Sequence, residues 1–208
     1  MIVEDVPALR QSSKQKYKEA VRARLIVAAR KIVGLKGFAK LTIVNVADEA
    51  GVATGSVYKH FDSKSTLCIE VYTQAARKEY EMLRRVLLGP GLASAKLCRC
   101  IEVMATRVQS NPVFAYALGV ESVDPAIADE RAACVDAIVG LFEELIEEGI
   151  RTGEFETQLS TISATAVVGV IKESLLGTRS FPILQSNASS QLIAAVQGFC
   201  LGAVMHPK

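Results

Sequence analysis

Apolar side chains recur at three- and four-residue spacing along most of the chain, which is the pattern of amphipathic helices. The first such run predicts a helix from about Ser13 to Leu35, preceded by a flexible arm at residues 1–12. The apolar face of this helix comprises Tyr17, Val21, Leu25, Ala28, Ile32 and Leu35. No stretch shows the strict alternation of a strand, and no internal repeat is visible. The pattern therefore predicts an all-α chain of about nine helices.

The segment from Thr42 to His60 is predicted as two short helices joined by a tight turn. Thr42 is a capping residue at the start of the first helix. Gly51 stands where a left-handed residue ends that helix, a conformation that favours glycine. The second helix, residues 53–60, presents small hydroxyls, a phenol and cations to solvent, and a helix with such a face suits the major groove of DNA. These side chains are Thr54, Ser56, Tyr58, Lys59 and His60.

Ser63 is predicted to cap a long helix that continues to Leu87, where a Gly-Pro-Gly sequence breaks it. This long helix is expected to link the segment around Gly51 to everything that follows. Asp124, with a proline after it, is predicted to open a further helix. The remaining apolar patterns predict helices at residues 92–110, 112–120, 125–150, 159–176 and 189–204.

Half of the 208 residues are hydrophobic, which is enough for a substantial core. The net charge of +2 conceals an uneven distribution. Residues 1–70 hold 12 Lys/Arg and 7 Asp/Glu, a net of +5, whereas residues 71–208 hold 12 and 15, a net of −3. Residues 10–40 alone contain ten basic side chains and one acidic side chain. By itself such a block indicates a solvated face, but beside the predicted pair of short helices it indicates a surface that faces phosphates.

The segment around Gly51 resembles the DNA-binding domain of the tetracycline-repressor (TetR) family. The resemblance is carried by Ala47-Asp48-Glu49-Ala50-Gly51-Val52-Ala53-Thr54-Gly55-Ser56-Val57-Tyr58-Lys59-His60-Phe61, with Ser63, Lys64 and Leu67. It covers about residues 17–72. It implies a three-helix helix-turn-helix domain at residues 13–62, followed by a helical ligand-binding and dimerisation domain at residues 63–208.

The same resemblance implies roles in DNA binding for individual side chains. Thr42 and Lys64, each at a helix start, would hold backbone phosphates with help from helix N–H groups. Tyr58 is similar to a phosphate-gripping tyrosine of the family, with packing in the core as its alternative role. Lys59 and His60 would reach bases or phosphates, and His60 is equally compatible with packing.

Base edges are expected to be read at the start of the recognition helix, by Thr54, Gly55 and Ser56. Glycine there would let the backbone approach DNA closely. One position departs from the family: Ala53 opens the helix where a hydroxyl residue is common. Thr54 is therefore expected to take over the capping role.

The last two predicted helices carry apolar residues on more than one side, so each needs more than one partner. A two-fold four-helix bundle, with two helices from each subunit of a homodimer, meets that need and suits two-fold DNA sites. Burial within a monomer is the alternative. The predicted interface residues are Ile162, Ala166, Gly169, Val170, Leu192, Ala195, Val196 and Phe199.

A helical domain attached to a DNA-binding head favours a switch, in which a small molecule binds one arrangement of the heads better than another. The resemblance implies that this effector lies among the middle helices. The side chains that could line its site are adaptable or aromatic, with one carboxylate, and each is also compatible with simple core packing. These candidates are Met82, Met104, Phe114, Tyr116, Ile138, Phe142 and Glu173.

Neither enzyme chemistry nor metal binding is indicated by the sequence. The five cysteines are scattered through helical segments, and Cys98 and Cys100 are two residues apart, so they point in different directions. Buried thiols in a reducing cytosol are expected. No catalytic set, phosphate loop or cofactor motif is visible, and we expect no cofactor. The first residues include two acids and no basic region, so a signal peptide is not expected, and no apolar run reaches the ~20 residues of a membrane span. A cytoplasmic protein without membrane association is expected.

These observations predict a homodimeric transcriptional regulator that binds palindromic double-stranded DNA, in the family's usual role of a repressor released by a small molecule. Two alternatives remain at this point. The chain could be a helical small-molecule-binding or interaction protein whose DNA-binding head is vestigial. It could also be a general nucleoid-type binder, which would have the same basic surface but no defined palindrome.

Overall fold

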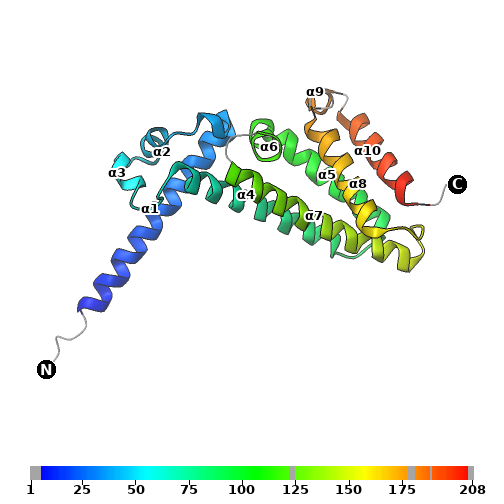
Figure 1. The fold of residues 1–208 in the computed structure, drawn as a ribbon, viewed down its shortest axis with the longest axis horizontal. Helices are drawn as coiled ribbons and strands as arrows, with labels where there is room; N and C mark the ends of the chain where they lie inside the picture. The colour runs from blue at the N-terminus through cyan, green and yellow to red at the C-terminus, as the bar shows by residue number, and fades with distance from the viewer. Residues whose placement is uncertain (1–5, 122–124, 178–180, 188, 206–208) are drawn as a thin grey trace.

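The structure, a computed structural model, describes residues 6–121, 125–177, 181–187 and 189–205. In this part of the chain the regular structure consists of α-helices and one short 3-10 helix, which confirms the predicted all-α fold (Figure 1). The elements are α1 (Val6–Lys36), η1 (Phe38–Lys40), α2 (Ile43–Ala50), α3 (Thr54–Val57), α4 (Lys64–Leu87), α5 (Ala93–Ser110), α6 (Pro112–Gly119), α7 (Pro125–Thr152), α8 (Ser160–Leu176), α9 (Phe181–Leu184) and α10 (Ser189–Val204).

The first helix is longer than the sequence pattern predicts. α1 begins at Val6, so helix occupies residues 6–12, which were predicted to be a flexible arm. The proline in that stretch lies in the first turn, where its missing N–H group costs no hydrogen bond. The first turns of α1 project away from the other helices (Figure 1). Tyr17 and Leu35 are 71% and 63% exposed, so only four members of the predicted face are buried: Val21, Leu25, Ala28 and Ile32. The buried side of α1 also includes Ile26, Ala29 and Val33.

Most other helix ends agree with the capping signals. The Thr42 hydroxyl accepts a hydrogen bond from the Asn45 N–H group at 3.1 Å, and Ser63 caps α4 in the same way. Two elements differ from the prediction. The recognition helix covers only residues 54–57 instead of 53–60, and the short helix α9 was not predicted. Asp124, the predicted cap of α7, lies outside the described residues.

Two hydrophobic cores stabilise the described structure. The first lies beneath the helix-turn-helix and contains Phe38 and Phe61, both at most 1% exposed. It does not stop at the start of α4, because Phe114 and Leu118 of α6 and Ile127 of α7 belong to it. The second core joins the far part of α4 to α5, α7, α8 and α10. Helix α6 belongs to the second domain and packs against α5 and α8, but it also packs against the DNA-binding head.

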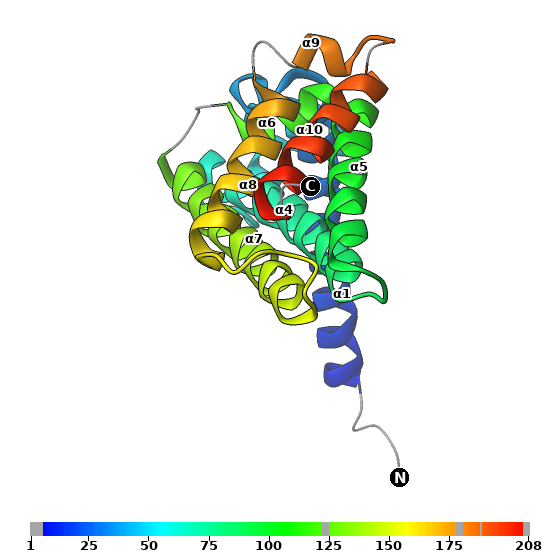
Figure 2. The same cartoon turned by 90° about the vertical axis from the view of Figure 1, so that its right-hand side faces the viewer.

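The long helices of the second domain pack side by side. α4 and α7 run next to each other along the molecule, and α5 and α8 complete the bundle (Figures 1 and 2). Figure 2 shows α10 lying against α5 and α8, with its opposite side facing outwards. Within the described residues, no helix combines the length and the apolar character that crossing a membrane requires.

Candidate nucleic-acid interface and effector cavity

A tight turn between α2 and α3 presents the short recognition helix. Gly51 has φ 64° and ψ 44°, the left-handed conformation that was expected of it. The Val52 N–H group donates to the Ala47 carbonyl at 3.0 Å, which closes the turn. Ala47 and Val57 have no exposed surface, so the crossing of the two helices is packed by small side chains. The turn and this packing fix which face of α3 points outwards.

The outward face consists of the side chains that the sequence predicted to contact DNA. Thr54, Gly55 and Lys59 are exposed, and Ser56 and His60 are half-buried. A β-carbon at position 55 would meet no atom of the described residues within 4 Å, so packing inside this chain does not require glycine there. The Tyr58 ring is 56% exposed, which excludes the alternative that it is a core residue. A contact of these side chains with DNA remains a prediction.

Ala53 is the N-cap residue of α3, with extended backbone angles, and the start of this helix has no side-chain cap hydrogen bond among the described residues. Thr54 was expected to take over the capping role, and it does not, because it is the first residue inside the helix. The Ser56 N–H group donates to the Ala53 carbonyl at 2.8 Å, which leaves the N–H groups of Thr54 and Gly55 for an external acceptor. A DNA phosphate is an acceptor of the right charge for a helix N-terminus.

Thr42 and Lys64 lie at the starts of the two helices on either side of α3. Thr42 is exposed at the start of α2, and Lys64 is half-buried in the first turn of α4. The N-termini of both helices carry the partial positive charge of the helix dipole. Both positions are thus suited to phosphate contacts, as the resemblance implied.

Arg22 of α1 contacts α4 and the residue Phe61 that follows the recognition helix. Its guanidinium donates a hydrogen bond of 2.8 Å to Glu70 of α4 and stacks over the Phe61 ring at 5.0 Å from the centroid. Hydrogen bonds from Arg22, and then from Gln74, lower the pKa of the Glu70 carboxyl. Arg22 therefore joins α1 to α4 and holds both helices against Phe61, the buried residue that follows α3.

His60 lies close to the positive charges of Lys18, Arg22 and Lys59. Its Nδ1 atom is buried and has no hydrogen-bond partner among the described residues. Desolvation is the largest cause that lowers the pKa of His60, followed by the positive charges of Lys18, Arg22 and Lys59. Relative to the unfolded chain, the folded protein therefore favours the neutral imidazole.

We expect the free energy of unfolding to fall as the pH drops below about 6.5, the ordinary histidine pKa, because the unfolded chain then binds a proton that the folded chain resists. Replacing His60 by glutamine should remove this part of the pH dependence. Urea denaturation between pH 5 and 8 measures both. Protonation of Glu70 also lowers the free energy of unfolding, but only at a lower pH, below its ordinary pKa of 4.5. This second decrease should persist in the His60 variant. Identical curves for the two proteins above pH 5 would contradict the assignment.

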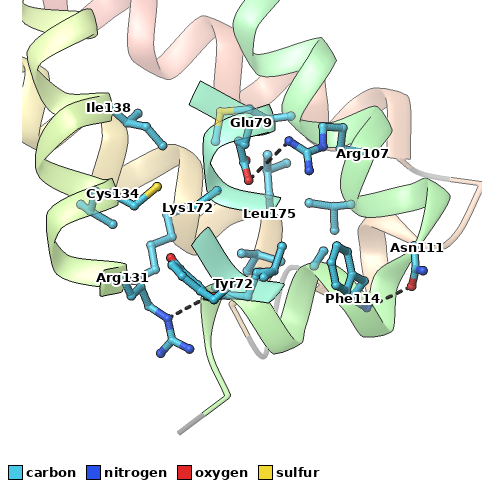
Figure 3. A pocket seen from close by; sticks show the side chains of 18 of the residues that line it. Tyr72, Glu79, Arg107, Asn111, Phe114, Arg131, Cys134, Ile138, Lys172 and Leu175 are labelled. Carbon is cyan, nitrogen blue, oxygen red and sulfur yellow. Dashed lines mark hydrogen bonds and ion pairs between the residues drawn. The ribbon is translucent and has the colours of Figure 1, made fainter. Parts of the chain in front are cut away.

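A cavity of about 290 Å³ lies between the head and the second domain, bounded by α1, α4, α5, α6, α7 and α8 (Figure 3). Its wall is mostly apolar, with Met104, Phe114, Ile138 and Leu175 among the lining side chains. This volume is near the lower end of small-molecule sites, ~300–1,000 Å³. Arg30 of α1 also lines the cavity, so the first helix of the DNA-binding head forms part of its wall.

Cations outnumber carboxylates among the residues that line this cavity. Glu79 and Arg107 form an ion pair on its wall, with 3.5 Å between carboxylate and guanidinium (Figure 3). Arg131 and Lys172 line it as well, and no other carboxylate is among the described lining residues. With Glu79 paired, the remaining charge of the wall is positive. The cavity can therefore hold an apolar group together with a negative charge.

The structure separates the predicted ligand candidates into two groups. Met104, Phe114 and Ile138 line the cavity. The other four, Met82, Tyr116, Phe142 and Glu173, are not among its lining residues. Phe142 is fully buried in the second core, and Tyr116 is 44% exposed on the outer side of α6. Apolar periodicity does not distinguish a side chain that fills a core from one that borders a cavity, so the sequence pattern placed residues of both kinds in one set.

The charged residues of the cavity wall were not found from the sequence. One signal was available. Glu79 follows Tyr72 and Ala75 on the same side of α4 and precedes the buried Leu83, so it interrupts an apolar helical face. A lone charge in such a position needs a partner, and here Arg107 provides it.

The outer sides of α8 and α10 carry most of the predicted dimer residues. Ile162 and Phe199 are 65% and 64% exposed, and Ala166, Gly169 and Ala195 are also exposed. Val170 and Leu192 are half-buried. Val196 does not fit the prediction, because it is 4% exposed and packs in the second core of this chain.

All five cysteines lie in the described part of the chain, and no disulfide joins them there. Burial raises the pKa of the Cys100 thiol to about 12 and that of Cys200 to about 11. The thiolate, which is the reactive form, is therefore disfavoured at both positions near neutral pH. The described residues also contain no group of three or more His, Cys, Asp or Glu side chains arranged to hold a metal.

Comparison with known proteins supports the assignment of the head. Residues 25–71 match the family model described as "Bacterial regulatory proteins, tetR family". Among curated proteins, the HTH-type transcriptional repressor KstR2 of Rhodococcus jostii (strain RHA1) is 25% identical over 146 residues, which cover 68% of this chain and 71% of that protein. The fatty acid metabolism regulator protein of Bacillus subtilis (strain 168) is 20% identical over 163 residues, 77% and 84% of the two chains.

Solved structures share the fold over nearly the whole chain. A TetR transcription regulator from Haloarcula marismortui superposes with a TM-score of 0.76 and 18% identity, covering 90% of this chain and all of that one. The regulator FadR from Bacillus subtilis, solved in complex with stearoyl-CoA, superposes with a TM-score of 0.74 and 18% identity, covering 88% and 99%. With the helix-turn-helix geometry, these findings lead to one conclusion: this chain is a transcriptional regulator whose residues 25–71 belong to the tetR family of bacterial regulatory proteins.

Proposed function

We propose that this chain is a homodimeric repressor that binds a two-fold DNA operator and is released when an effector occupies the cavity. One observation carries the proposal. The cavity wall includes α1, through Arg30 and Gly34, and α1 is also the helix on which the DNA-binding head is built. An effector that binds one position of α1 more tightly than another would change the placement of α3 on DNA.

Charge and exposure support duplex DNA as the partner. The head carries the basic excess of the chain and presents the predicted contact residues on an exposed face. Affinity should come mainly from phosphates and sequence preference from a few base edges. We therefore assign Lys64 and Thr42 to phosphates, and Thr54 and Ser56 to bases.

Replacing Lys64 by alanine is expected to weaken binding to all duplexes by a similar factor and to reduce the salt dependence of the affinity by about one unit of slope, because one phosphate contact is lost. Replacing Ser56 by alanine should instead change the preference among sites, at about 1–3 kcal/mol for the base pair concerned. Fluorescence anisotropy over a salt series, with an operator selected from random DNA, measures both.

The exposed Lys78, in the middle of α4, offers a matched control, since its replacement removes the same charge at a distance from α3. A Lys78 variant that flattens the salt slope as much as the Lys64 variant would contradict the assignment. If the wild-type protein prefers no sequence over any other, the protein is a general binder instead of a regulator of defined sites.

The outer side of α8 and α10 supports the homodimer. Ile162 and Phe199 are large apolar side chains left exposed in the subunit, and the exposed Gly169 and Ala195 would allow close approach of a partner helix. A two-fold pairing of these helices makes a four-helix bundle and places two heads on one operator. Half-sites should then be one helical turn, ~10 bp, or a multiple of it apart.

The cavity supports an effector with an apolar body and an anionic group. Its wall combines apolar side chains with Arg30, Arg131 and Lys172. A relative with the same fold was solved with stearoyl-CoA, a molecule of that description, and we propose the same chemical class for this chain.

We expect long- or medium-chain acyl-CoA to raise the melting temperature of the protein and to lower its affinity for the operator, because a ligand that binds the folded state stabilises it. The matched probes are coenzyme A, which lacks the apolar chain, and the methyl ester of the acyl group, which lacks the charge. Each should have a smaller effect than stearoyl-CoA or octanoyl-CoA. Equal effects of the ester and the thioester would show that the cations do not take part in recognition.

A further inference from the structure

Helix α6 lies between the cavity and the DNA-binding head. Its first turns already contact both. A β-carbon at Gly34 of α1 would lie 3.1 Å from the Asn111 amide nitrogen, so the two helices approach closely here. Further along α6, the Arg30 guanidinium lies over the Phe114 ring at 5.4 Å from the centroid. All four residues line the cavity. The start of α6 is thus held against α1 at the cavity wall.

In addition to the packing of Leu118, one carboxylate binds the end of α6 to the head. Glu121 accepts hydrogen bonds from the backbone N–H groups of Phe38, at 2.8 Å, and Ala39, at 2.9 Å. These two groups open η1, the turn that leads into α2. N–H groups at the start of a helix have no partner within it, and a carboxylate gives them charge-assisted hydrogen bonds. Glu121 therefore fixes the beginning of the helix-turn-helix from outside it.

The approach of this carboxylate depends on the glycine before η1. Gly37 has a φ of 79°, and a β-carbon there would lie 2.7 Å from a Glu121 carboxylate oxygen. Any other residue would be strained in its backbone and would also collide with the carboxylate. Because Gly37 has no β-carbon, the Glu121 carboxylate can approach the start of η1.

Arg131 of α7 also binds the end of α6. Its Nε atom donates to the Leu118 carbonyl at 2.8 Å, and a terminal nitrogen donates to the Glu121 carbonyl at 2.7 Å. These are carbonyl groups at the C-terminal end of α6, which a cation satisfies well. Arg131 also lines the cavity, where its side chain is labelled in Figure 3. One residue, Glu121, is therefore bonded to the cavity wall by its backbone and to the head by its side chain.

We infer that Glu121 is the positioning residue that couples occupancy of the cavity to the placement of the recognition helix. This rests on the proposed function. An anionic effector group attracted to Arg131 competes for N–H donors that now hold the Leu118 and Glu121 carbonyls. When Arg131 turns towards the effector, the end of α6 loses these bonds, and the Glu121 carboxylate shifts relative to the Phe38 and Ala39 N–H groups. The start of α2 then loses its external anchor, and with it the fixed geometry of α2 and α3.

The coupling can be tested without an effector by a double-mutant cycle on the full chain. The variants are Arg131→Ala, Glu121→Gln, which nearly preserves the side-chain volume, and the two together. Arg151→Ala is the matched control, because it removes an exposed arginine at the other end of α7. The measurement is amide hydrogen exchange of Phe38 and Ala39, resolved by NMR. The buried amide of Leu145 in the second core reports whether each variant is folded.

We expect Glu121→Gln to accelerate exchange of Phe38 and Ala39 by about tenfold, because a charge-assisted hydrogen bond is replaced by a neutral one. Arg131→Ala should accelerate it by several-fold in the presence of Glu121 and should add nothing once Glu121→Gln is present. Arg151→Ala should have no effect. An Arg131→Ala effect of the same factor in both backgrounds, or no effect in either, would overturn the inference.

The same four proteins give a functional readout with an operator selected from random DNA. Arg131→Ala should lower the affinity several-fold when Glu121 is present and leave it unchanged when Glu121→Gln is present. Equal losses in the two backgrounds would count against the coupling. If the wild-type protein selects no operator, the proposed function fails, while the exchange measurement still decides whether Glu121 links the cavity wall to the head.

Discussion

Replacing Phe61 by alanine is expected to lower the free energy of unfolding of the DNA-binding head by about 3–5 kcal/mol, the usual cost of removing a fully buried aromatic ring. Phe61 is 1% exposed, and the Arg22 guanidinium stacks on its ring. The variant loses the buried apolar surface and leaves a cavity under the segment that carries the recognition helix. Urea denaturation followed by circular dichroism measures the loss, and operator binding should disappear with it.

Tyr58 is the matched control, since it is an aromatic residue of the same segment but is 56% exposed. Replacing it by alanine should change the free energy of unfolding by no more than about 0.5 kcal/mol, as for other surface substitutions. Its operator affinity should nevertheless fall, if the phenol holds a phosphate as the family resemblance implies. A Tyr58 variant as unstable as the Phe61 variant would show that its ring supports the fold instead.

Replacing Phe142 by alanine is expected to cost a similar amount, about 3–5 kcal/mol, but in the second domain. Phe142 has no exposed surface and lies in the core formed by α4, α5, α7, α8 and α10. Because it does not line the cavity, the loss should appear in stability and not as a selective loss of effector affinity. Differential scanning calorimetry with and without stearoyl-CoA separates the two effects.

Phe199 gives the matched comparison in this domain, because it is 64% exposed on α10. If α8 and α10 form the dimer, Phe199→Ala should lower the melting temperature more in dilute than in concentrated solution, since dissociation depends on concentration. The Phe142→Ala loss should be largely independent of concentration. A concentration-independent effect of Phe199→Ala would argue that this face contacts something other than a second subunit.

Local signals accounted for much of the fold. Thr42 and Ser63 cap helices as expected, and Gly51 adopts the left-handed conformation that its place in the pattern required. Each of these outcomes depends on a few neighbouring residues, so the sequence alone specifies it. The length of α3 could not be predicted from neighbouring residues in the same way. The turn after Val57 serves the burial of Phe61, which is a tertiary requirement that helical periodicity does not contain.

The residues that surround the cavity depended on contacts between distant parts of the chain. Glu121 is more than 80 residues from its partners Phe38 and Ala39, and nothing in the local pattern of either segment indicates the other. Val196 illustrates a second limit. Its neighbours in α10, Ala195 and Phe199, are also apolar, so the pattern indicated helix but not which side faces the interior.

The shared core between the head and α6 bears on how such regulators can be recombined. A graft that exchanges residues 13–62 for the head of another regulator would leave Phe114, Leu118 and Ile127 facing a foreign surface. It would also separate Glu121 from the backbone of residues 37–39 that fits it. A hybrid that keeps both its solubility and its response would have to carry α6 and the first turns of α7 along with the transplanted head. The unit of exchange in this architecture is therefore discontinuous in the gene, although the helix-turn-helix itself is one unbroken segment.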